Sequence, residues 1–341
     1  MPKIKVAILG VGNVASALVQ SVYAKQIPGL WHKRVGGHAF SDVEIVAAFD
    51  VDKRKIGLEL SDAIFQAPNV GPKFSKVPKT KIIVKTGILK DPPPRHLADS
   101  LVETDSIVKE LKESGAVIAL SLIPSGMHKT SVAYANQCLA AGVSFVNTTP
   151  SIVALKSDLR TKFQKAKLVL VGDDLMSQFG GTAFHKGILD FINSRGIEIE
   201  KSYQLDVGGG NETLNTISED VKVEKRDIKT ESIAAEVPYK FATVAGTTDY
   251  VDYMGNNRTS YFWIAAKGAF DSKVEIDVYL RTNDGANAVN VILDVIRAVS
   301  YSLKRKQFGS PAEINNYGFK ELPEPVLLHR AHAEFTKKFV K

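Results

Sequence analysis

Residues 3–24, KIKVAILGVGNVASALVQSVYA, predict a strand, a tight glycine-rich turn and a helix. The beginning is apolar and β-branched, and the later part carries apolar side chains at helical spacing. Gly10 permits the tight turn, Gly12 lets the backbone approach a pyrophosphate, and Ala15 replaces a third glycine where helix meets strand. The stretch therefore indicates a dinucleotide site at a helix N-terminus, with an unliganded glycine turn as the alternative.

An acidic residue ends the second predicted strand, VEIVAAFD at 43–50. Asp50 lies where such sites place the acid that binds the ribose, although the usual interval of about twenty residues is lengthened here by an inserted loop at 25–42. A carboxylate at this point binds ribose hydroxyls and repels a 2′-phosphate, which favours NAD over NADP. The alternative for Asp50 is a helix cap for the segment that begins at Lys53.

Strands and amphipathic helices alternate through the first half of the chain. The strands AVIALSLI (116–123), VSFVN (143–147) and LVLVGDD (168–174) each follow a helical stretch. This alternation predicts an α/β fold with a doubly wound parallel sheet of the Rossmann type.

The pattern changes after residue 190. Four β-rich runs follow, KSYQLDVGG (201–209), YKFATVAG (239–246), TSYFWIAA (259–266) and KVEIDVYL (273–280). Most are not separated by helices of comparable length, which predicts a second α+β domain with a mostly antiparallel sheet. A long amphipathic stretch at 287–305 is expected to return to the first domain.

Composition narrows the possible partners. The net charge of +7 is scattered, without a basic stripe interleaved with aromatics, so we expect anionic metabolites as partners and no nucleic acid. Cys138, the single cysteine, excludes an intramolecular disulfide and fits a reducing, cytoplasmic compartment. No run approaches the roughly eighteen apolar residues of a membrane span, so no membrane partner is expected.

The chain resembles the myo-inositol-1-phosphate synthase family in its shorter archaeal and bacterial form. The likeness runs nearly end to end and includes, in order, GVGNVASALVQ, VAAFDVD, VGDDLMSQFGGT, YQLDVGG, DIKT and NDGAN. The resemblance implies an NAD-dependent isomerase that converts D-glucose 6-phosphate to 1D-myo-inositol 3-phosphate by oxidation at C5, enolisation, aldol closure and re-reduction. It also implies a homotetramer and a role in inositol and phospholipid biosynthesis.

The same resemblance implies a division of labour between the domains. Residues 1–183 and 285–341 would form the NAD-binding Rossmann domain, and residues 184–284 the catalytic and oligomerisation domain. The catalytic residues it implies are Lys225, Lys229, Lys320, Asp174 and Asp284. Crowded, partly desolvated lysines have lowered pKa values and can take and return protons. Without the resemblance, each lysine would be interpreted as a solvated surface residue.

Two further sets of residues follow from the resemblance. The cofactor set comprises Gly10, Gly12, Asn13, Val14, Ala15, Asp50, Ser121, Pro124, Thr148 and Asp173. The substrate set comprises Ser177, Gln178, Gly181, Thr182, Arg258 and Asn287. Asp173 has the alternative of capping the turn. Asp284 and Asn287 could orient a lysine or hold a divalent cation near the phosphate, magnesium or manganese, which family members often need. The sequence itself has no metal signature, and HRAH at 329–332 fits a surface helix better than a zinc site.

Three positions depart from the family pattern. Met176 and Thr259 stand where lysines are usual, and Asp206 replaces an asparagine. These changes predict weaker phosphate affinity, unless Arg258 compensates. Two alternatives to the isomerase therefore stay open: a related NAD-dependent dehydrogenase of another polyol or sugar phosphate, and a catalytically silent NAD-binding relative. Retention of the lysine and acid set argues against the silent protein.

Overall fold

The computed structural model describes residues 2–94, 97 and 101–340. A six-stranded, fully parallel sheet has the order β5-β4-β1-β6-β7-β8. Its strands are β1 (Ile4–Leu9), β4 (Val43–Asp50), β5 (Lys85–Thr86), β6 (Ile118–Ser121), β7 (Ser144–Asn147) and β8 (Leu170–Val171). The strand order reverses between β1 and β6, and ligands of such sheets bind at the carboxyl ends of the strands beside that reversal. The predicted Rossmann-type sheet is confirmed.

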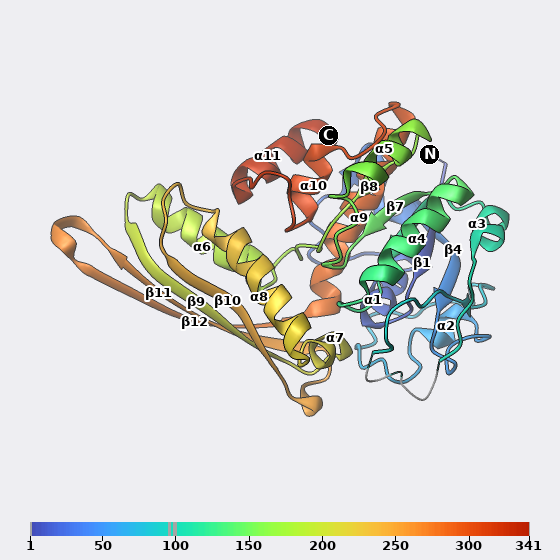
Figure 1. Cartoon of the computed structure of the whole chain (residues 1–341), viewed down its shortest axis with the longest axis horizontal. Helices are drawn as coiled ribbons and strands as arrows, with labels where there is room; N and C mark the ends of the chain where they lie inside the picture. The colour runs from blue at the N-terminus through green and yellow to red at the C-terminus, as the bar shows by residue number, and fades with distance from the viewer. Residues whose placement is uncertain (1, 95–96, 98–100, 341) are drawn as a thin grey trace.

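Helices cover both faces of this sheet because its strands are apolar on both sides. Val6 and Ile8 of β1 pack toward α1 (Asn13–Val22) and α9 (Asp284–Lys304). Ala7 and Leu9 pack toward α3 (Val108–Ser114), α4 (His128–Ala141) and α5 (Ser157–Lys165). The long helix after the second sheet does return to the first, as the sequence predicted, and lies against α1 (Figure 1).

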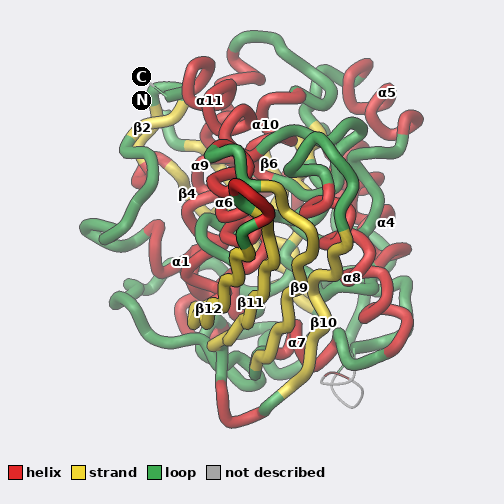
Figure 2. The backbone as a smooth tube through the Cα atoms, turned by 90° about the vertical axis from the view of Figure 1, so that its left-hand side faces the viewer, coloured by secondary structure: helices red, strands yellow, loops and turns green. Residues whose placement is uncertain are grey.

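The second sheet has the order β10-β9-β11-β12. Its strands are β9 (Glu198–Gly208), β10 (Ala242–Tyr250), β11 (Asn257–Lys267) and β12 (Lys273–Asn283). Only the β9–β10 pair is parallel, so the predicted mostly antiparallel sheet is confirmed. Figure 2 shows these long strands side by side.

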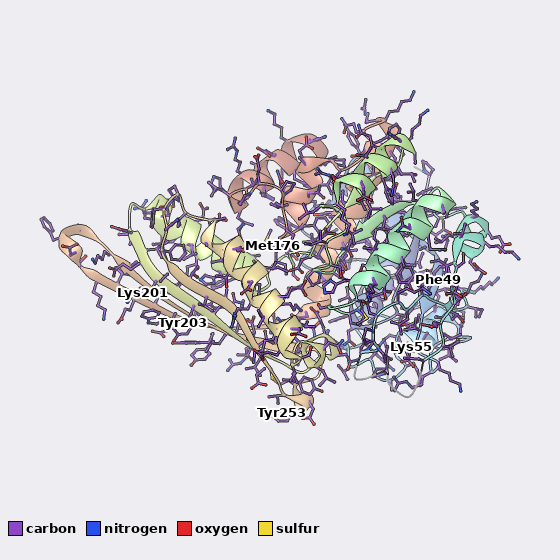
Figure 3. The ribbon with its side chains drawn as sticks, in the orientation of Figure 1. Phe49, Lys55, Met176, Lys201, Tyr203 and Tyr253 are labelled. Carbon is purple, nitrogen blue, oxygen red and sulfur yellow. The ribbon has the colours of Figure 1, made fainter. Side chains whose placement is uncertain are left out.

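One face of the second sheet is covered and the other is open. Helices α6 (Gly181–Ser194) and α8 (Glu219–Ala234) pack on the covered face, where Leu189, Ile233 and Ile264 meet (Figure 1). The open face carries a row of aromatic rings from Tyr203, Tyr261, Trp263 and Tyr279. In Figure 3, Tyr203 and Lys201 project from the side away from the helices.

Short elements complete the chain. They are β2 (Arg34–Val35), β3 (His38–Ala39), the 3-10 turn η1 (Phe40–Asp42), α2 (Leu60–Ala63), α7 (Asn211–Asn215), α10 (Ala312–Gly318) and α11 (Leu328–Phe339), with 3-10 turns η3 (Asp252–Met254) and η4 (Ala269–Asp271). The loop expected at 25–42 thus holds a small hairpin. None of the helices in the described part of the chain combines the length and apolar character that a membrane crossing requires.

Candidate active site

A cavity of about 240 Å³ lies where the two sheets meet. Its walls come from the β1–α1 turn, the end of β4, the loop after β6, the segment after β8, helix α8 and the beginning of α9. One end of the cavity lies at the carboxyl end of β1, where the strand order reverses. The other end lies against the covered face of the second sheet. The cavity therefore connects the β1–α1 turn to the charged side chains of the second domain.

The glycine turn faces this cavity as the sequence indicated. Gly10 has a φ of +99°, and a Cβ there would lie 2.8 Å from the carbonyl oxygen of Leu122. A Cβ on Gly12 would meet nothing within 4 Å, because Gly12 borders the open cavity. Gly10 is thus required for close packing, whereas Gly12 leaves space for a ligand at the N-terminus of α1. Asn13, Val14, Pro124 and Thr148 also line the cavity.

Asp50 lines the same end of the cavity and also holds the turn in place. Its Oδ2 accepts a hydrogen bond from the Val11 N–H at 2.7 Å, and its Oδ1 accepts from the Val51 N–H at 2.7 Å. Lys55, which sequence reasoning missed, lies 4.0 Å from Asp50 and donates to the Val11 carbonyl at 2.8 Å. Burial lowers the pKa of Lys55. No spacing in the sequence signals Lys55, because only folding brings it to the turn.

Three residues of the expected cofactor set do not line the cavity. Ala15 is buried between helix and strand, the packing role that its spacing suggested. Ser121 is buried at the end of β6, away from the cavity wall. The Asp173 carboxylate accepts hydrogen bonds from the Val153 and Ala154 N–H groups, and so fixes the loop after β7. The Asp173 side chain thus makes the contacts expected of the capping alternative and does not line the cavity. Burial raises its pKa to about 6.

The three expected lysines converge on the cavity, and each is paired with a carboxylate. Lys320 Nζ lies 2.6 Å from Asp174, whose backbone has a φ of +58°. Lys225 and Lys229, four residues apart on α8, present their side chains on one face. Burial, followed by the nearby cations, lowers the pKa of Lys229. The lysines are therefore crowded and desolvated, as proton-transfer chemistry requires.

The sequence did not predict which carboxylates pair with the two α8 lysines. Lys225 Nζ lies 2.6 Å from Glu212 of α7, and Lys229 Nζ lies 2.8 Å from Asp206 of β9. Arg258 adds a further ion pair, 2.9 Å from Asp284. Burial raises the pKa of Asp284, and Arg258 opposes that shift. The five expected catalytic residues thus lie together in one charged network around the cavity.

The expected phosphate segment lies partly at the cavity. Ser177, Gly181 and Thr182 line it at the N-terminus of α6, where free N–H groups favour an anion. The Gln178 side chain instead bonds to Asn290, and the Asn287 amide donates to the Phe179 carbonyl at 3.4 Å. Neither side chain lines the cavity, so the structure does not bring these two residues together with Ser177, Gly181 and Thr182.

The strand register also corrects the interpretation of Thr259. Along β11, Arg258 lines the cavity and Ser260 donates to Asp206, so Thr259 between them faces the opposite side of the sheet. A lysine at 259 would extend from the open face, whereas the Arg258 side chain lines the cavity on the covered face. Met176 does line the cavity, and Figure 3 shows it between the two halves of the molecule.

The expected cation site at Asp284 and Asn287 does not fit this geometry. Asp284 is already paired with Arg258, and the Asn287 side chain lies outside the cavity. Elsewhere among the described residues, Asp190, Glu236 and His329 form a possible metal-ligand group on α6, after α8 and on α11. The Lys186 ammonium lies 3.1 Å from Glu236 and already neutralises that carboxylate.

Comparisons with known proteins agree with this arrangement. The family model described as myo-inositol-1-phosphate synthase matches residues 180–285. The inositol-3-phosphate synthase of Mycolicibacterium smegmatis is 33% identical over 97% of this chain and 96% of its own. The protein of the same name from Mycobacterium tuberculosis is 32% identical over 94% of this chain and 92% of its own. The crystal structure of Ari2 matches with a TM-score of 0.77 at 28% identity, covering 98% of both chains. The chain therefore belongs to the myo-inositol-1-phosphate synthase family.

Proposed function

We propose that the chain is an NAD-dependent isomerase that converts D-glucose 6-phosphate to 1D-myo-inositol 3-phosphate. The observation that carries the proposal is the convergence of three carboxylate-paired lysines on a cavity that begins at the glycine turn. A proton network beside a dinucleotide site suits a reaction that oxidises a hydroxyl and later restores it.

Each group of residues at the cavity has its own role in the proposed reaction. NAD, when bound, supplies a hydride acceptor and later a hydride donor. The Lys320–Asp174 pair takes the proton of the C5 hydroxyl and returns it after ring closure. Lys225 and Lys229 stabilise the negative oxygens of the enolate and of the aldol product. The N-terminus of α6, with Ser177 and Thr182, holds the phosphate.

Gly12→Asp tests the cofactor site without disturbing the fold. Gly12 is the N-cap of α1 in an extended conformation, where aspartate is a preferred residue, so the melting temperature should not fall. The new carboxylate would occupy and repel the diphosphate position. NAD affinity, measured by calorimetry, should fall by about a hundredfold or more. The matched variant Gly12→Ala should lose less, and unchanged NAD affinity in Gly12→Asp would place the cofactor elsewhere. The position of Asp50 at the end of β4, lining the cavity, supports a preference for NAD over NADP, because its carboxylate would repel a 2′-phosphate.

One observation favours a second candidate function. Met176 gives the cavity wall an apolar side chain beside the phosphate segment. A dehydrogenase of another polyol or sugar phosphate would accept this change, and would release NADH after each turnover.

Cofactor recycling separates these two functions. Glucose 6-phosphate with substoichiometric NAD should give inositol phosphate over many turnovers, without NADH accumulating at 340 nm in proportion to product. Mg²⁺ or Mn²⁺ would be added, because the phosphate oxygens of the substrate are ligands that these cations favour. NADH rising one for one with substrate consumed would identify a dehydrogenase. A failure of every sugar phosphate and every free polyol tested to raise the melting temperature of the NAD-loaded protein would contradict both functions.

The remaining proposals concern assembly and setting. The aromatic open face of β9–β12 supports a homotetramer built through that sheet. The two sheets support an NAD-binding domain of residues 1–183 and 285–341 and a catalytic and oligomerisation domain of residues 184–284. A cytoplasmic role in inositol and phospholipid biosynthesis completes the proposal.

A further inference from the structure

Asp206 is a buried carboxylate, and both of its oxygens accept hydrogen bonds. It is 2% exposed, and it accepts hydrogen bonds from Lys229 Nζ at 2.8 Å, from Ser260 Oγ at 2.5 Å and from Gln204 Nε2 at 3.0 Å. Arg258 lies 3.9 Å away. Burial alone would raise the pKa of Asp206, but the Lys229 and Arg258 cations hold it well below its usual range. Asp206 therefore stays ionised throughout the working pH range.

The fold provides a path by which Lys229 reaches this carboxylate. The Lys229 side chain extends from α8 across Gly246, which sits at a register shift in β10 with a φ of +85°. A Cβ on Gly246 would overlap Lys229 Cδ. Strand β10 thus leaves a gap that fits the lysine stem, and the lysine has a defined orientation against the sheet.

We propose that Asp206 is a positioning residue that holds Lys229 as an ammonium, oriented to stabilise oxygen anions and donate protons rather than to act as the initial base. The Lys320–Asp174 pair is then left to take the C5 hydroxyl proton. This division of roles rests on the proposed isomerase function, whereas the charge state of Lys229 can be measured independently of it.

The direction of the pH effect follows from the charges around Lys229. Lys225 faces it from α8, Arg258 from β11, Lys320 from the segment after α10 and Asp206 from β9, with Asp284 nearby at the start of α9. Burial and the three cations lower the pKa of Lys229, and Asp206 opposes them. Removing the Asp206 charge must therefore lower that pKa further, by about one to three pH units for a partner at this distance.

The variant Asp206→Asn changes the charge while keeping the shape. If Lys229 acts as an ammonium, activity is lost as pH rises through its pKa, so the alkaline limb of kcat/KM should move to lower pH by about one unit or more. Ser260→Ala, which removes a hydrogen bond to Asp206 but no charge, should move the limb much less. Asp206→Glu should keep it near the original position.

A spectroscopic titration makes the test independent of the reaction. In protein labelled with ¹³C at lysine Cε, the Lys229 signal, assigned through Lys229→Arg, should titrate at lower pH in Asp206→Asn than in the unchanged chain. An unmoved Lys229 titration would overturn the proposal, as would an alkaline limb that stays in place while the rate falls equally at every pH. If glucose 6-phosphate is not a substrate, the titration still decides the charge state, so the two proposals fail separately.

Discussion

Lys320→Ala is expected to lower the turnover of glucose 6-phosphate by about a hundredfold or more, the usual effect of losing a general acid or base. Lys320 Nζ lies 2.6 Å from Asp174, and both residues line the cavity. Its removal takes away the group that carries the C5 proton and leaves the Asp174 carboxylate without its ion-pair partner. NAD affinity should change little, because the glycine turn and Asp50 are untouched. Steady-state kinetics and calorimetry measure the two quantities.

Lys222→Ala provides the matched control. Lys222 lies on α8 near Lys225, is only partly buried and does not line the cavity, so its loss should leave turnover nearly normal. If Lys320→Ala also keeps near-normal turnover, Lys320 is not a proton carrier. If NAD affinity falls in parallel with turnover, the variant has disturbed the cofactor site instead.

The fold could be predicted from the sequence because its signals are local and repeated. Each strand and helix up to residue 174 can be recognised from its own residues, and so can each β-rich run after residue 190. The parallel pairing of β9 with β10 left no such signal, since it depends on how the chain crosses over through α7 and α8. The hairpin within 25–42 was too short to produce a period.

The site was predictable where its residues share one element. Lys225 and Lys229 meet because four residues make about one helical turn. Their carboxylates, Glu212 and Asp206, come from other elements, and no spacing along the chain encodes those pairs. Thirteen residues separate Glu212 from Lys225, and twenty-three separate Asp206 from Lys229.

Strand β11 contained a usable signal that aromatic residues obscured. Phe262 and Ile264 are fully buried and share the parity of Arg258, which places Arg258 on the covered face. Tyr261 and Trp263 on the other face are also apolar enough to hide the alternation. Since a shift of one residue moves a side chain to the opposite face, Thr259 lies on the open face although its neighbour Arg258 lines the cavity.

Arg258→Met is expected to reduce stability strongly, because Arg258 is the only cation within ion-pair distance of Asp284 among the described residues. Arg258 is 13% exposed and lies between Asp284 at 2.9 Å and Asp206 at 3.9 Å. Breaking a buried pair by removing one partner costs about 3–5 kcal/mol, and we expect about 3 kcal/mol here because 31% of the Asp284 side chain stays exposed. Denaturant unfolding at pH 8 measures the loss.

The pH dependence of that loss identifies its cause. Burial already raises the pKa of Asp284, and removing Arg258 must raise it further. A carboxyl whose folded-state pKa exceeds its unfolded value takes up a proton on folding, so its stability penalty is greatest above the folded pKa and fades as pH falls. The deficit of Arg258→Met should therefore be smaller at pH 5 than at pH 8.

Adding Asp284→Asn should recover much of the stability at pH 8, because no uncompensated charge is then left at that position. A deficit that is equal at both pH values and is unrelieved in the double variant would assign the loss to packing of the arginine stem rather than to its charge.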